Sequence, residues 1–126
     1  MNNVNIDEKY YKGFEGEPEM TFLIEVQNEI PKAIGIWEGY FSEIIKRIEP
    51  SECGWNGLAY YYHLDIGWFE ECPWLIPNLQ EAYEQLKNIS LDVLGEKAEK
   101  EIVEKITDLM REAMSKKGKM YILYDV

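Results

Sequence analysis

The chain has 126 residues, a length that a single hydrophobic core can serve, so we expect one domain over residues 1–126. Acidic residues outnumber basic ones by 24 to 13, which gives a formal net charge of −11. This charge argues against nucleic acid and anionic membranes as partners, because proteins that bind them supply Lys and Arg. It favours a basic protein partner instead.

The sequence contains no run of about 18 apolar residues that could span a bilayer. Its first eight residues form neither a basic nor an apolar segment, so we expect a cytoplasmic protein. Cys53 and Cys72 are the two cysteines, and their spacing matches no metal-binding pattern. We expect reduced thiols there, with a disulfide or a metal role as the alternative.

The N-terminal third predicts an arm, a strand and a helix. Residues 1–18 are polar and interrupted by glycines and a proline, so we expect a loosely structured N-terminal arm that tyrosine and phenylalanine side chains pin to the body. Residues 20–27 alternate between apolar and polar, as in a half-buried strand, with Leu23 as the exception. Apolar residues in 36–48 follow helical spacing.

The rest of the chain predicts a strand rich in aromatics at 57–66, helices at 77–89 and 96–117, and a final strand at 119–126. Residues 68–74 fit either a loop or a strand. Helices on one side of a small sheet would bury all the apolar faces. The sequence therefore predicts an α+β domain with a small, mainly antiparallel sheet packed against about three helices.

The acidity is not spread evenly along the chain. Residues 95–119 carry seven basic and six acidic residues, whereas residues 1–94 carry six basic and 17 acidic ones. Between Arg47 and Lys87 there is no Lys or Arg, but there are seven carboxylates and eight aromatic residues. We call residues 48–86 the acidic segment.

Trp and Tyr are frequent interface anchors, and neighbouring carboxylates attract a cationic partner. The acidic segment therefore suggests a docking surface. The alternative is that its aromatics belong to the core and its carboxylates form a solvated face. The run from Trp68 to Trp74 has no clear period and could form a loop that presents Trp68, Phe69 or Trp74. The candidate partner-binding residues are Glu52, Trp55, Asp65, Trp68, Phe69, Glu70, Glu71 and Trp74.

Motifs for catalysis are missing from the sequence. His63 is the single histidine, which restricts acid–base and metal chemistry, and no phosphate-binding glycine loop is present. We therefore expect no enzyme, no catalytic residue, no metal and no cofactor. One alternative stays open: a small metal-dependent or hydrolytic enzyme that uses His63, Asp65 and Glu70 or Glu71.

In its size, its acidity and the tract from Trp55 to Trp74, with the Gly54-Trp55, Gly67-Trp68 and Pro73-Trp74 pairs, the chain resembles the immunity proteins of bacterial polymorphic and contact-dependent toxin systems. This resemblance implies a protein that binds a cognate toxin domain, often a basic nuclease. We expect the free protein to be a monomer or a weak homodimer. An acidic phage-type inhibitor of a nucleic-acid enzyme would use the same mechanism, so it remains a second interpretation.

Overall fold

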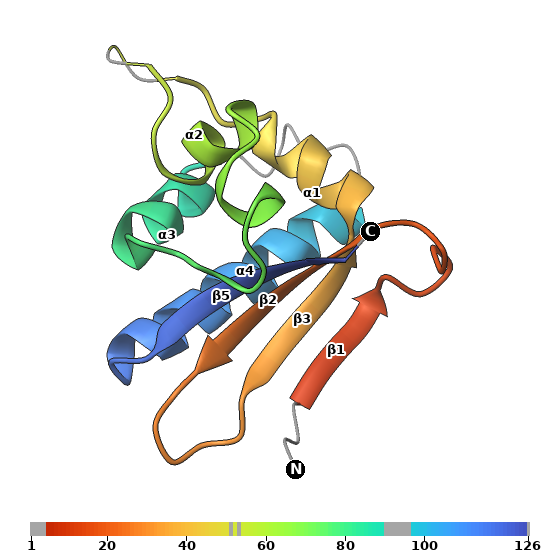
Figure 1. The fold of residues 1–126 in the computed structure, drawn as a ribbon, viewed down its shortest axis with the longest axis vertical. Helices are drawn as coiled ribbons and strands as arrows, with labels where there is room; N and C mark the ends of the chain where they lie inside the picture. Colours follow the sequence, from red (N-terminus) through yellow and green to blue (C-terminus); the bar gives the residue numbers. More distant parts are fainter. Residues whose placement is uncertain (1–4, 51, 53, 90–96, 126) are drawn as a thin grey trace.

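A computed structural model describes residues 5–50, 52, 54–89 and 97–125. Figure 1 shows a sheet with helices behind it and beyond one end of its strands. In chain order the elements are β1 (Asn5–Tyr10), β2 (Glu19–Glu25), β3 (Lys32–Trp37), α1 (Glu38–Ile45), α2 (Gly57–His63), the 3₁₀ turn η1 (Gly67–Phe69), β4 (Trp74–Leu75), α3 (Leu79–Lys87), α4 (Lys97–Ser115) and β5 (Lys119–Asp125).

The sheet is mixed and mostly antiparallel, and its strand order is β1-β3-β2-β5-β4. Strand β1 runs parallel to β3, while the β2–β3, β2–β5 and β4–β5 pairs are antiparallel. The described residues form four helices and five strands. The predicted α+β class is therefore confirmed.

The core lies between the helices and one face of the sheet. On β2, Met20, Phe22 and Ile24 are fully buried. They pair across the sheet with Tyr124, Ile122 and Met120 of β5. Helix α4 packs behind these strands (Figure 1). Its apolar stripe is buried, as the helical spacing of 96–117 predicts: Ile102, Val103, Ile106, Met110 and Ala113.

The predictions for β2, α3, α4 and β5 are confirmed to within a few residues at each end. The predicted helix over 36–48 begins only at Glu38, because residues 32–37 form the extra strand β3. All four residues from Ala33 to Ile36 are buried, so β3 lacks the alternation that identifies a half-buried strand. Ala33 and Gly35, on the face opposite Ile34 and Ile36, are small and not polar, so the sequence pattern did not reveal the strand.

The expectation of a loosely structured arm is wrong for residues 5–10, which form β1. Tyr10 is buried and donates a hydrogen bond of 2.8 Å from its hydroxyl to Glu101 on α4. A second contact to α4 joins Lys105 to Asp7 at 3.5 Å. The pinning role of the aromatics is confirmed, since Phe14 also stacks on Trp37 at 4.3 Å between ring centroids.

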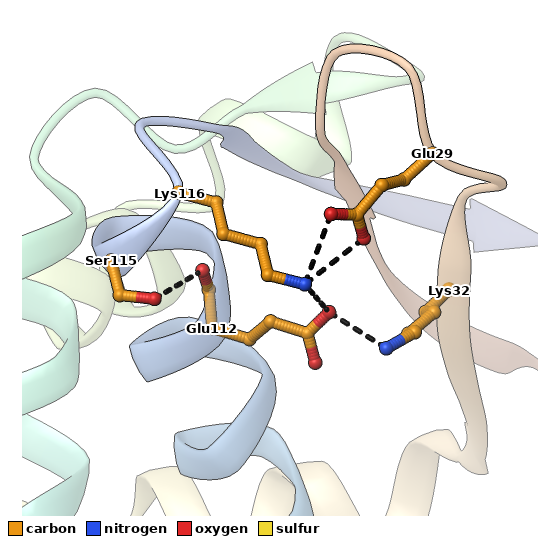
Figure 2. Close-up of polar contacts among 5 residues, drawn as sticks. All are labelled: Glu29, Lys32, Glu112, Ser115 and Lys116. Carbon is orange, nitrogen blue, oxygen red and sulfur yellow. Dashed lines mark hydrogen bonds and ion pairs between the residues drawn. The ribbon is translucent and has the colours of Figure 1, made fainter.

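An ion-pair network ties the end of α4 to the β2–β3 turn (Figure 2). Lys116 lies 3.0 Å from a Glu29 carboxylate oxygen and 3.3 Å from Glu112, which also accepts a hydrogen bond of 2.7 Å from Lys32. The bond from Lys32 lowers the pKa of Glu112, and the bond to Glu29 raises the pKa of Lys116. Glu29 and Glu112 are therefore both paired with lysine side chains.

Candidate partner-binding surface

The segment 57–66 is not a strand: residues 57–63 form helix α2. The side chain of Gln85 on α3 stabilises its first turn, donating to the Asn56 carbonyl at 2.7 Å and accepting from the Ala59 N–H at 3.3 Å. Gly57 allows this approach, because it has a φ of +56° and a Cβ there would lie 2.7 Å from the Gln85 amide oxygen. A contact 26 residues away thus overrides the strand preference of the aromatic run.

As a helix, α2 buries Leu58 and Ala59 and turns other side chains outward. Tyr60 is 41% exposed and Leu64, at the helix C-cap, is 52% exposed. Neither residue is among the predicted partner-binding residues, because a strand places Leu64 on the same face as Leu58. Helical spacing of Leu58, Ala59 and Tyr62 was the signal that could have found them.

Trp55 precedes α2 and reaches along it. Its ring stacks on His63 at 3.9 Å between centroids, with an interplanar angle of 24°. Trp55 is half-buried, and His63 is exposed. The stack brings the turn before α2 against the last residue of the helix.

The expectation that Trp68 and Trp74 are presented to a partner is wrong. Trp68 is 2% exposed and Trp74 is 8% exposed. Their rings lie 5.4 Å apart, and Trp68 also contacts Phe41 at 5.6 Å. Both residues therefore belong to the core, where η1 and β4 place them.

Phe69 occupies an intermediate position. It is half-buried, and its ring lies 5.5 Å from that of Tyr124 on β5 and 6.3 Å from that of Tyr62 on α2. Glu70 and Glu71 follow it directly and are exposed, and both backbone N–H groups donate to the Gly67 carbonyl. This tight turn holds the two carboxylates in solvent next to η1.

The remaining predicted residues, Glu52 and Asp65, are exposed. Asp65 follows α2 in the left-handed region at a φ of +54°, which Asp tolerates better than most residues. Five of the predicted partner-binding residues therefore stay in the candidate surface, and Tyr60 and Leu64 join them. We call the set Glu52, Trp55, Tyr60, Leu64, Asp65, Glu70 and Glu71 the α2 surface.

None of the seven carboxylates in the acidic segment forms an ion pair with another described residue. In the described part of the chain, every ion pair involves α4 or Lys116 just after it. The acids that form ion pairs therefore lie on α4 or contact α4 or Lys116. None of them belongs to the acidic segment.

Three of the unpaired carboxylates, Glu49, Glu81 and Glu84, line an open groove of about 580 Å³ between the end of α1 and α3. Arg47 is the one basic group among the described residues that line it. The groove continues the acidic character of the α2 surface onto α3. A cationic side chain entering it would meet more negative than positive charge.

The described residues contain no group of three or more His, Cys, Asp or Glu side chains placed to hold a metal ion. No described helix is long and apolar enough to cross a membrane. Comparisons of this chain with family models, curated proteins and solved structures gave no match.

Proposed function

We propose that this chain is a binding protein of the immunity type, which neutralises a bacterial toxin domain by covering a basic part of its surface. The observation that carries the proposal is the set of seven carboxylates in the acidic segment that lack an ion pair in the described structure. Such carboxylates repel one another when free and gain most from a cationic partner.

The apolar part of the α2 surface supports the same proposal. Tyr60 and Leu64 lie one helical turn apart and are exposed beside Asp65. An interface needs anchors that bury apolar area inside a polar rim, and tyrosine is among the residues most often found in that role. Charge would then guide the approach of the toxin domain, and these side chains would supply the buried contact.

The test is co-expression with the toxin domain encoded by the adjacent gene, followed by measurement of its Kd. We expect Glu70→Lys combined with Glu71→Lys to weaken binding by about 1–2 kcal/mol, or roughly tenfold, without loss of the fold. Both side chains are exposed, so the substitutions leave the core intact.

The matched control is Glu43→Lys combined with Glu104→Lys, which makes the same change in net charge at exposed positions of α1 and α4. Binding in this control should stay close to wild type. Equal weakening in both double variants would show that only net charge matters and would remove the α2 surface from the proposal. A neighbouring set of metabolic genes, with no toxin domain that binds, would contradict the function itself.

A further inference from the structure

One apolar row crosses all five strands of the sheet. Residues that pair directly across neighbouring strands point to the same face. Leu23 pairs with Ala33 on β3 and with Tyr121 on β5, and these in turn pair with Ile6 on β1 and Leu75 on β4. The apolar row is therefore Ile6, Ala33, Leu23, Tyr121 and Leu75.

This row lies on the face of the sheet opposite the core. The buried side chains of β2 alternate with Leu23, and no described helix covers the front of the strands in Figure 1. Ile6 and Leu75, at the two ends of the row, are 42% and 40% exposed. The exception in the alternation of β2 is thus part of a surface stripe.

Three carboxylates stand at one end of the same face, and we call them the acidic corner: Glu8, Glu19 and Asp125. Glu19 pairs directly with Asp125 across β2 and β5. Its carboxylate lies over Gly35 of β3, where a Cβ would overlap Glu19 Oε2 and come within 3.4 Å of Glu8 Cγ. A side chain at position 35 would therefore displace the corner.

The acidic corner contains an unsatisfied group. Glu19 Oε2 is buried and has no hydrogen-bond partner, and none of the three carboxylates forms an ion pair with a described residue. Burial, then a side-chain hydrogen bond with Glu8, and then the charges of Glu8 and Asp125 raise the pKa of Glu19 to about 7. The bond with Glu8 needs a proton between the two carboxyl groups, and without that proton Glu19 Oε2 has no partner. A cation placed here would relieve both the repulsion and the missing bond.

We infer that the uncovered sheet face is a second docking surface, for a protein segment that carries Lys or Arg beside apolar side chains. The apolar row would bury the apolar side chains, and the acidic corner would receive the cation. Charge complementarity selects this occupant over a second copy of the chain, because two copies with a net charge of −11 each repel one another. The inference does not rest on the proposed function, since the two surfaces share no residue.

The experiment uses the full chain, labelled with ¹⁵N, and two synthetic peptides of equal length and charge. One peptide alternates leucine with lysine, and the other alternates serine with lysine. We expect the leucine peptide to bind at least about tenfold more tightly, because only it can bury apolar area on the row. Its largest chemical-shift changes should fall on the amides of β2 and β5.

Two variants with a control locate the contacts. Leu23→Thr should weaken binding of the leucine peptide several-fold. Asp125→Asn should weaken its binding to a similar extent, because it removes a charge from the acidic corner. Glu104→Gln, at an exposed position on α4, should leave binding unchanged. The peptide comparison on the wild-type chain decides the question even if Leu23→Thr fails to fold.

Equal affinity for the two peptides would overturn the inference, because the face would then respond to charge alone. Shift changes centred on α2 and η1 would also overturn it, while supporting the proposed function. The Glu70→Lys and Glu71→Lys variant should lose toxin binding and still bind the leucine peptide. This result would show that the two surfaces bind their partners independently.

Discussion

Glu19 shows how one carboxyl group can make stability depend on pH. Burial and its neighbours Glu8 and Asp125 raise its pKa from 4.5 to about 7 in the folded chain. Between these values the folded state holds a proton that the unfolded state has released. The free energy of unfolding should therefore fall as the pH rises from about 4.5 to about 7, and the loss should be complete above that range.

Glu19→Gln should remove this dependence, because the amide keeps the shape of the side chain and does not ionise. A fully buried group with such a shift would contribute several kcal/mol, and the partial exposure of Glu19 reduces our expectation to about 1–2 kcal/mol. Urea unfolding at pH 5 and pH 8 measures the difference. Parallel pH profiles for wild type and variant would contradict the prediction, and Glu104→Gln, on exposed α4 surface, is the control.

At the scale of single residues, the sequence showed which groups are apolar but not always which way they point. Trp68 and Trp74 sit in an aperiodic run, so no pattern indicated that both are buried. Leu23 broke the alternation of its strand, and its role became visible only with the register that places it opposite Tyr121. Register depends on pairing between distant segments, which a single sequence does not record.

At the scale of elements, α2 depends on α3. Gln85→Ala removes the acceptor for the Ala59 N–H and one of the two donors to the Asn56 carbonyl. The Ala59 N–H then loses its partner, while the Asn56 carbonyl keeps the bond from the Tyr60 N–H. We expect a loss of about 1–2 kcal/mol in stability. Amides in α2 should also exchange faster with solvent, because the helix opens more often.

Gln80→Ala is the matched control for this change, since Gln80 lies on the same helix and its amide donates to Glu84, also on α3. Hydrogen exchange in α2 should stay at the wild-type rate in that variant. Equal protection of α2 in Gln85→Ala and wild type would show that the aromatic run forms a helix by itself. The strand preference of that run would then have no bearing on the fold.

The elements with clear periodicity were predicted correctly, and the reasons are local. Helices α3 and α4 each bury one apolar stripe, and β2 and β5 alternate. The errors fall where tertiary contacts decide: β1, which pairs with β3 and is tied to α4, and α2, which Gln85 caps. The candidate surface changed with α2, because a helix exposes Tyr60 and Leu64.

At the scale of the whole molecule, the charge divides the chain into two regions. Helix α4 is nearly neutral and contributes to most of the ion pairs of the described residues, whereas no carboxylate of the acidic segment forms one with a described residue. The net charge of −11 also creates a long-range electrostatic field, in addition to the local charge of the acidic segment. The field acts on the approach of a basic partner more than on the final contact.

Association with the basic toxin domain should therefore be sensitive to salt. The screening length falls from about 10 Å at 0.1 M to about 3 Å at 1 M ionic strength, so steering by the acidic segment should be largely lost at high salt. We expect the association rate to drop at least about tenfold across this range and the dissociation rate to change much less. Stopped-flow mixing measures both rates. The Glu70→Lys and Glu71→Lys variant should show a flatter dependence than wild type, and an association rate independent of salt would mean that the unpaired carboxylates do not guide the partner.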